Sequence, residues 1–312
     1  MKIHHSLQKF SFTRPVVTVG MFDGVHLGHR FVIETLKKIA ASSGGESVII
    51  SFWPHPRIVL GKTDHRFSLL NTKEEKMRLL NDCGVDHLLM VPFTLEFSRL
   101  TSDEFVKNVL VDQVGVKQLL VGANNHYGRN REGNAETISE QAVTYGFEII
   151  RPDMLQLGND KVSSTSIRNM LLDGDVSRAA QHLGYQYSLS GVVEEGDRLG
   201  RTIGYPTANI RPDEPNKLIP PDGVYAVTGT VDANEYEGML YIGERPTLKK
   251  TEKKKKIEVH LFKFAADIYG KNLEIRFVTR VRGDIKFESL DALTSQLRKD
   301  ETTIKEILKT KI

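Results

Sequence analysis

The sequence is poor in cysteine, since Cys83 is the only one among 312 residues. A single thiol cannot form an internal disulfide, and it excludes a zinc site built from several thiolates. Such sparing use of cysteine is typical of proteins that work in a reducing compartment. We therefore expect a cytoplasmic protein.

Long apolar runs and an excess of one charge are also missing. No stretch approaches the roughly 20 apolar residues of a membrane-spanning helix, and the opening MKIHHSLQKF has no apolar segment of signal-peptide length. The 43 Lys plus Arg residues nearly balance the 40 Asp plus Glu residues. Because dedicated nucleic-acid-binding proteins usually have a strongly basic surface, we expect neither a membrane nor a nucleic-acid partner.

The first half of the chain has the pattern of an α/β domain. Short apolar, β-branched runs alternate with helical patterns, which is typical of a parallel sheet with crossover helices. The expected strands span residues 16–20, 47–52, 87–93, 118–123 and 147–150. Capping-box spacing predicts helix starts at Thr72 and at Thr101, each with a glutamate three residues later.

The second half has a different pattern, in which strand-like segments are separated by turn residues. These segments span residues 187–196, 223–231, 235–243, 257–264 and 273–282. Such a series predicts an antiparallel barrel or sandwich. Two short helices are expected within 163–184, and a final helix, 290–308, is expected across one end of the barrel. We therefore predict two domains, 1–184 and 185–312.

The segment VTVGMFDGVHLGH joins an expected strand, a glycine-bearing loop and a helix start. Backbone N–H groups and the positive end of the helix dipole meet there and favour a bound phosphate. His26 and His29 share one helix face, where imidazole N–H groups can stabilise charge on a phosphoryl group. The residues alone leave two alternatives open: a metal site that includes Asp23, or histidines that only pack.

These motifs resemble a known family. GMFDGVHLGH is similar to the HxGH signature of the nucleotidyltransferase superfamily, and the surrounding residues resemble its flavin branch, the bifunctional riboflavin kinase/FMN adenylyltransferases or FAD synthetases. The segments SFWPHP, VGANNHYG, SSTSIR, GYPTANI, PDGVYAV, GERPT and EVHLFKF follow in the family's order. The resemblance covers essentially the whole chain. It implies a Rossmann-like N-terminal domain and a barrel-shaped kinase domain.

The resemblance also implies roles for residues of the N-terminal half. ATP is expected to bind at the HxGH motif, with His26, His29 and Arg168 taking part in catalysis. The residues expected to hold the nucleotide are Gly20, Phe22, Asp23, Gly24, Asn124, Ser164 and Thr165. From the side chains themselves, Ser164 and Thr165 can cap the next helix while Arg168 reaches pyrophosphate oxygens. An ordinary helix cap followed by a surface arginine is the alternative.

The chain departs from the family at two places. In VGANNHYG, Asn125 stands where the family has an aromatic residue, and only Tyr127 keeps aromatic character. Loss of a stacking surface is expected to weaken nucleotide or flavin binding at the adenylylation site. At 184–187, GYQY replaces the family's GRPY, which alters the linker rather than the chemistry.

The segment GDRLGRTIGYPTANI carries a candidate magnesium site. Thr207 and Asn209 are two residues apart, so an extended strand directs both side chains to one face. Their neutral oxygens suit Mg²⁺, which keeps waters and phosphate oxygens as its other ligands. Gly196, Gly200 and Gly204 precede them at intervals of four and are either turn residues or, as the resemblance implies, part of the ligand site.

The strand IEVHLFKF carries a candidate base. Its apolar residues point one way, while Glu258 and His260 point the other. Most strand glutamates of this kind are merely solvated, but the resemblance implies that Glu258 accepts the proton of riboflavin's ribityl hydroxyl. It further implies that Arg282 lies near the flavin and that 243–247 forms a mobile flap. The run KKTEKKKK (249–256) is expected to be a solvated hairpin loop.

Together these features predict an enzyme with two active sites. The barrel is expected to phosphorylate riboflavin to FMN with ATP and Mg²⁺. The N-terminal domain is expected to join FMN to AMP from a second ATP, giving FAD and pyrophosphate. We expect these small molecules to be its partners and the protein to be a monomer or weak homo-oligomer. The alternatives are a nucleotidyltransferase with another acceptor and a catalytically reduced regulator that binds flavin or nucleic acid.

Overall fold

The structure is a computed structural model. It describes residues 1–62, 67–122, 127–152, 156–157, 160–196, 200, 203–244 and 255–310. By their contacts these residues form two compact units, one of Met1–Phe67 with Lys73–Ser163 and one of Ser68–Thr72 with Ser164–Ile312. The domain split at residues 184 and 185 stays a prediction. By contacts, the two helices of 164–183 belong to the second unit.

The first unit is built on a six-stranded parallel sheet with the strand order β1-β4-β3-β2-β5-β6. The strands are β1 (Lys2–His4), β2 (Val16–Val19), β3 (Ser47–Trp53), β4 (His87–Pro92), β5 (Gln118–Leu120) and β6 (Glu148–Ile150). The order reverses at β2, because β3 and β4 lie on one side of it and β5 and β6 on the other. In open parallel sheets, ligands bind beyond the carboxyl ends of the strands at such a point.

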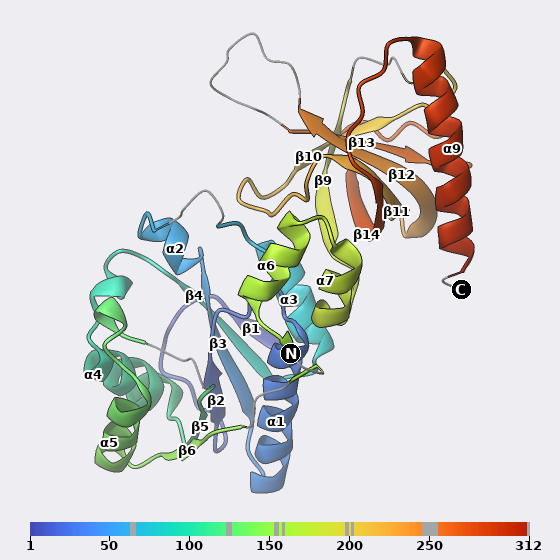
Figure 1. The fold of residues 1–312 in the computed structure, drawn as a ribbon. Helices are drawn as coiled ribbons and strands as arrows, with labels where there is room; N and C mark the ends of the chain where they lie inside the picture. Colours follow the sequence, from blue (N-terminus) through green and yellow to red (C-terminus); the bar gives the residue numbers. More distant parts are fainter. Residues whose placement is uncertain are drawn as a thin grey trace. The chain divides into compact units, whose positions relative to one another are not determined.

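Helices cover both faces of this sheet, which explains why its strands read as nearly continuous apolar runs. The helical elements are α1 (Leu27–Ser43), α2 (Pro56–Val59), α3 (Lys73–Asp82), η1 (Phe97–Arg99), α4 (Ser102–Glu104), η2 (Phe105–Val114), η3 (Arg129–Arg131) and α5 (Ala135–Tyr145). Strand β7 (Gln156–Leu157) pairs antiparallel with β8 (Asp160–Lys161). Figure 1 shows α1 and α5 on opposite sides of the sheet.

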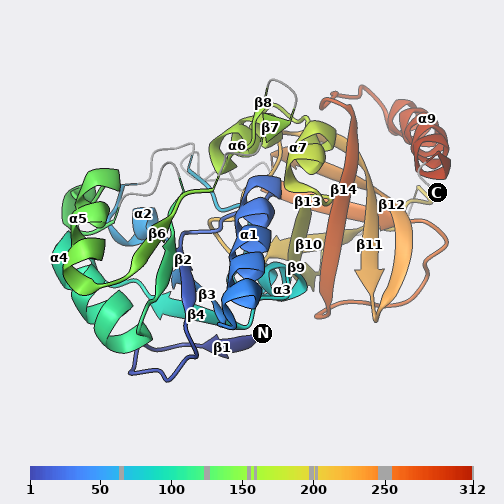
Figure 2. The ribbon, with the colours of Figure 1, turned by 90° about the horizontal axis from the view of Figure 1, so that it is seen from below.

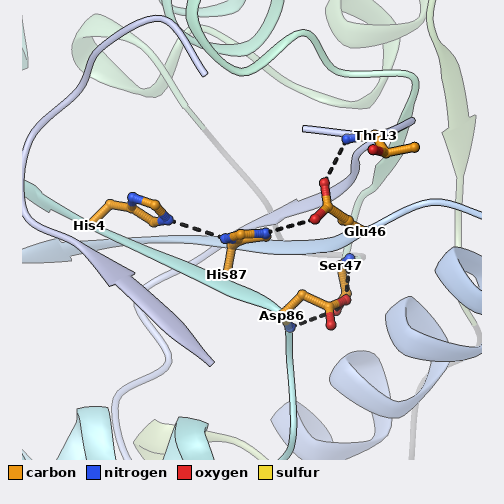
Figure 3. Close-up of polar contacts among 6 residues, drawn as sticks. All are labelled: His4, Thr13, Glu46, Ser47, Asp86 and His87. Atoms are coloured by element: carbon orange, nitrogen blue, oxygen red, sulfur yellow. Dashed lines mark hydrogen bonds and ion pairs between the residues drawn. The ribbon is translucent and has the colours of Figure 1, made fainter. Parts of the chain in front are cut away.

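The edge strand β1 was not predicted, and a polar cluster fastens it to the sheet (Figure 3). A ring nitrogen of His4 lies 3.1 Å from Nδ1 of His87, and Nε2 of His87 lies 3.2 Å from Oε1 of Glu46. The other oxygen of Glu46 accepts the backbone N–H of Thr13 at 2.6 Å. The cluster thus joins the N-terminal segment to the amino ends of β3 and β4.

The second unit contains a closed antiparallel barrel of six strands in the order β10-β13-β12-β11-β14-β9. The strands are β9 (Ser188–Glu194), β10 (Ala208–Pro212), β11 (Gly223–Val231), β12 (Asn234–Glu244), β13 (Lys255–Leu261) and β14 (Asn272–Arg282). Its helices are α6 (Ser164–Leu172), α7 (Val176–Leu183) and α9 (Leu290–Lys309). The expected fold class, an α/β domain and an antiparallel barrel with a C-terminal helix, is confirmed.

Helix α9 packs on the outer wall of the barrel rather than across one end, as Figure 2 shows. On β11, Tyr225 and Val227 face the interior, whereas Val224 and Ala226 face outward. These outward residues form an apolar core with Ile304 and other residues of α9. Because the outer wall is apolar at this point, the amphipathic helix covers it.

Candidate active sites

The loop between β2 and α1 turns sharply before the two histidines. Phe22, Gly24 and Val25 have positive φ angles of 48°, 92° and 34°. Two of them are not glycine, so the loop holds strained backbone conformations that burial must maintain. Phe22 is 3% exposed and Val25 is fully buried. Gly20 permits the turn, since a Cβ there would lie 3.0 Å from Cε2 of Phe22.

His26 is the N-cap of α1. Its Nδ1 accepts the backbone N–H of His29 at 3.2 Å, so a neutral His26 carries its proton on Nε2 and can donate from there. The two imidazole rings are stacked, with centroids 3.6 Å apart and planes 14° from parallel. Gly28 allows this arrangement, because a Cβ at that position would lie 3.2 Å from the His26 ring.

His29 is held in the neutral state. Burial lowers the pKa of His29 well below 6.5, and the charges of His26 and Lys76 lower it further. Nδ1 of His29 is enclosed and has no hydrogen-bond partner among the residues that the structure describes. The two stacked imidazoles and the first N–H groups of α1 therefore lie together at the start of the helix, which suits an anionic, hydrogen-bonding ligand such as a triphosphate.

An apolar cavity of about 640 Å³ lies at the carboxyl ends of β2 and β5. Aromatic side chains line much of it: Phe52, Phe93, Phe97, Phe105 and Tyr127. The loop contributes Gly20 and Met21, whereas neither histidine is among the lining residues. Burial raises the pKa of Tyr127, whose hydroxyl donates to Gln141 at 2.9 Å. The volume and lining fit a planar aromatic ring system beside the phosphate-binding loop.

The SSTSIR motif spans the start of α6, and its residues from Ser164 onward belong to the second unit. Ser164 and Thr165 are the first two residues of the helix. Nε of Arg168 donates to the backbone carbonyl of Ser68 at 2.7 Å, which joins α6 to the segment 68–72. The contact gives Arg168 a structural partner, and its predicted role at pyrophosphate stays a prediction.

In the barrel, the structure brings the candidate magnesium ligands and the candidate base together. Asn209 of β10 is the direct cross-strand partner of Glu258 of β13, so both side chains lie on one face. Thr207 and Glu258 line a second cavity, of about 320 Å³. Alternation along the sequence had placed Thr207 and Asn209 on one face, and Glu258 and His260 on one face of the other strand. The register of the two strands brings these two pairs side by side.

Three glycines precede the candidate magnesium ligands, and the structure constrains each of them in a different way. A Cβ at Gly196 would collide with the amide of Asn209, and a Cβ at Gly200 would collide with the carbonyl of Tyr205. Gly204 has φ 84° and turns the chain towards Thr207. The first two positions therefore require the absence of a side chain, and the third requires a left-handed backbone.

Charged partners surround Glu258 and Arg282. Nζ of Lys256 lies 2.9 Å from Oε1 of Glu258. Arg282 makes a forked contact with Asp300 of α9, with Nη2 2.7 Å from Oδ2 and Nε 3.0 Å from the same oxygen. The ion pair of Lys256 with Glu258 could have been predicted, because the two residues are two apart in one strand. No local pattern links Asp300 to Arg282.

Models of two known families match different parts of the chain. A model of the FAD synthetase family matches residues 9–166, and a model of the riboflavin kinase family matches residues 183–308. The chain belongs to the bifunctional riboflavin kinase/FMN adenylyltransferase family. A family member from Listeria monocytogenes is 38% identical over 96% of this chain and 95% of its own. One from Escherichia coli K12 is 35% identical over 97% and 95%.

A solved structure of similar fold carries a different description. A Streptococcus pneumoniae chain described as a macrolide-efflux protein has a TM-score of 0.86, is 30% identical, and is matched over 96% of this chain and 98% of its own. Across the described parts of the present chain, we find no helix with the length and apolar character needed to traverse a bilayer.

The donor set of the barrel fits the Mg²⁺ that this family uses. No group of three or more His, Cys, Asp or Glu side chains among the described residues could hold a metal ion by itself. Thr207 and Asn209 offer neutral oxygens, and the missing side chain of Gly196 leaves room for the Asn209 amide. Such a set suits a cation that takes its remaining ligands from ATP phosphates and water.

Two predicted features lie outside the described residues. Asn124, expected to hold the nucleotide, and Asn125, which replaces the family's aromatic residue, fall within 123–126. The same is true of 245–254, which covers most of the expected flap and lysine loop. Tyr127, next to the first of these segments, does line the larger cavity.

Proposed function

We propose that this protein makes FMN from riboflavin and FAD from FMN, with the kinase site in the barrel and the adenylyltransferase site at the β2–α1 loop. The observation that carries the proposal is the cross-strand pairing of Asn209 with Glu258 beside Thr207, together with the stacked rings of His26 and His29 at the start of α1. The enzyme is a transferase at both sites.

In the barrel, Glu258 accepts the proton of the ribityl 5′-hydroxyl as that oxygen attacks the γ-phosphorus of ATP. The new P–O bond forms as the bond to ADP breaks, and ADP leaves in line with the attack. Thr207 and Asn209 would hold Mg²⁺, which neutralises charge on the phosphates. Gly196, Gly200 and Gly204 let the backbone approach the ligand. Arg282, which lines the cavity, is proposed to lie near the flavin.

In the first unit, an oxygen of the FMN phosphate attacks the α-phosphorus of ATP, and pyrophosphate leaves. His26 and His29 donate hydrogen bonds to the phosphate oxygens, and the N–H groups of α1 add to them. No covalent enzyme intermediate is needed, because catalysis comes from positioning and charge stabilisation. The aromatic cavity holds the isoalloxazine ring of FMN, which suits its apolar lining.

The remaining predicted residues complete the proposal. Gly20, Phe22, Asp23 and Gly24 form the loop that receives the nucleotide. Asn124, Ser164, Thr165 and Arg168 are proposed to contact ATP on the strength of their motifs. The sparing use of cysteine supports a cytoplasmic location. We further propose that the protein acts as a monomer or weak homo-oligomer and has no nucleic-acid partner.

The experiment that tests the proposal separates flavins after incubation with ATP and Mg²⁺. Riboflavin as substrate should give FMN and then FAD, and FMN as substrate should give FAD alone. FMN without FAD would remove the adenylylation claim and direct attention to Asn125. Neither product would refute the proposed function as a whole, and FMN consumed with another nucleotide would favour a different transfer.

A further inference from the structure

Helix α9 contributes to the cavity of the barrel, and the mechanism above uses none of its residues. Leu293 and Leu297 line the cavity together with Glu258 and Arg282. The two leucines are four residues apart, so they lie on one face of the helix. Asp300 follows three residues after Leu297 and continues this face. The face of α9 that reaches the cavity therefore also carries a carboxylate.

The carboxylate of Asp300 is buried and holds the guanidinium of Arg282. Asp300 is 2% exposed. Its Oδ2 accepts from Nη2 of Arg282 at 2.7 Å and from Nε at 3.0 Å. Its Oδ1 accepts from the same Nε at 3.1 Å and from the side-chain amide of Gln296, one turn earlier on α9, at 2.8 Å. Both oxygens thus have partners, and the forked contact fixes the plane of the guanidinium.

The other N–H groups of Arg282 show what this arrangement can do. Nη1 donates to the backbone carbonyl of Gly283 at 3.0 Å. Contacts with the described residues therefore use one N–H on each nitrogen, three of the five that a guanidinium carries. One N–H on Nη1 and one on Nη2 are left for a ligand in the cavity that Arg282 lines.

Other contacts fasten α9 to the barrel independently of Arg282. Glu301, the residue after Asp300, accepts the hydroxyl of Tyr205 at 3.0 Å. Further along the helix, Ile304 and Leu308 belong to the apolar core that α9 shares with the outer wall of the barrel. The helix is therefore held on this wall by more than the carboxylate of Asp300, so attachment of α9 does not by itself account for the forked contact.

We propose that Asp300 is a positioning residue of the kinase site: its carboxylate fixes the guanidinium of Arg282 so that the two remaining N–H groups face riboflavin. The inference rests on the proposed kinase function, in which Arg282 lies near the flavin. It adds that α9 sets the affinity for flavin through Asp300, which does not itself line the cavity. An ion pair that only held the helix in place would affect stability and leave substrate binding unchanged.

The test replaces Asp300 by asparagine, which keeps the shape of the side chain and leaves one acceptor oxygen in place of two. Asp300→Asn should raise KM for riboflavin by about tenfold, because a hydrogen bond that involves a charged group contributes about this much. KM for ATP should stay within about twofold, since Asn209 and Glu258 lie on β10 and β13. Ile304→Val is the matched control, because it loosens the packing of the same helix and leaves the carboxylate intact. It should leave both KM values within about twofold.

A second readout does not depend on turnover. Binding of riboflavin is followed by its fluorescence in the presence of Mg²⁺ and ADP, which has no phosphoryl group to transfer in this reaction. Asp300→Asn should weaken binding by about tenfold in the wild-type background. In an Arg282→Met background it should cause no further loss, because the carboxylate acts through the guanidinium.

Urea unfolding reports whether each variant is folded. If Asp300→Asn is not, Gln296→Leu takes its place, because it removes only a neutral donor to the same carboxylate. This variant should raise KM for riboflavin by about threefold and leave KM for ATP unchanged. An unchanged KM for riboflavin in Gln296→Leu would then overturn the role of Asp300.

The outcomes separate this inference from the proposed function. If wild type makes no FMN, the proposed kinase activity fails. If wild type makes FMN and Asp300→Asn retains KM for riboflavin within about twofold, only the role of Asp300 is overturned. Equal losses of affinity for riboflavin and for ATP, or a further loss in the Arg282→Met background, also overturn it, because Asp300 would then act on the barrel as a whole.

Discussion

Replacement of Glu258 by glutamine should abolish most of the kinase activity while sparing adenylylation. The substitution keeps the size of the side chain and an oxygen that can accept from Lys256, which lies 2.9 Å from the carboxylate. It removes the group that takes the proton of the attacking hydroxyl. Since general bases contribute about 10²- to 10⁴-fold, kcat for FMN formation should fall by that factor.

The structure supplies a matched control on the neighbouring strand. Glu194 of β9 pairs with Asn209 from the side opposite Glu258, so it is also a glutamate beside the candidate magnesium ligand. It does not line the cavity, and its partner is Arg211. Glu194→Gln should therefore leave kcat within about twofold, since exposed ion pairs contribute little.

The assay follows FMN formation from riboflavin and FAD formation from FMN in separate reactions. Glu258→Gln should affect the first reaction and leave the second within about twofold, because nothing in the proposed mechanism of the first unit uses this carboxylate. An equal loss of both reactions would indicate misfolding or dependence between the sites. Unchanged FMN formation would refute the assignment of Glu258 as the base.

Three further predictions concern other parts of the chain. Gly28→Ala should lower FAD formation by about tenfold and spare the kinase, because the added Cβ lies 3.2 Å from the His26 ring; equal effects on both activities would contradict this. Asp300→Asn should destabilise the barrel by about 3 kcal/mol, measured by urea unfolding, since it weakens the forked contact of Arg282; an unchanged midpoint would refute it. The pKa of His4 is lowered by burial and by neighbouring positive charges. The unfolded chain therefore binds more protons than the folded chain as the pH falls below about 6.5. Wild type should lose stability as the pH falls through that value, and His4→Gln should lose less. Equal losses of stability in the two proteins would contradict the prediction.

Local patterns predicted the elements whose burial follows a simple period. The β-branched run of residues 223–231 became β11 (Gly223–Val231) without a change of bounds. The short strand β1 escaped detection because its three residues show no apolar alternation, and side-chain contacts with His87 fasten it instead. The amphipathic pattern of α9 was evident from the sequence, whereas the apolar barrel wall that the helix covers was not.

The candidate sites divide along similar lines. Thr207, Asn209 and Glu258 were found because alternation in a strand decides which side chains share a face, and strand register then brought the latter two together. The burial of Lys76 could not be predicted, because a lysine within KEEKMRLLND has the surroundings of a surface residue. Only the packing of α3 in the folded unit buries it. The local sequence does not show which charged residues become buried when distant segments pack together.

The most direct test of the account uses ATP labelled at one phosphorus at a time. With riboflavin, Mg²⁺ and γ-labelled ATP, the label should enter FMN and then FAD, because the barrel transfers the terminal phosphoryl group. With α-labelled ATP, the label should enter FAD and never FMN, because the first unit transfers AMP. Label from the α-phosphate in FMN would contradict two separate phosphate-transfer sites on this chain. The absence of label from both flavins with either labelled ATP would contradict them as well.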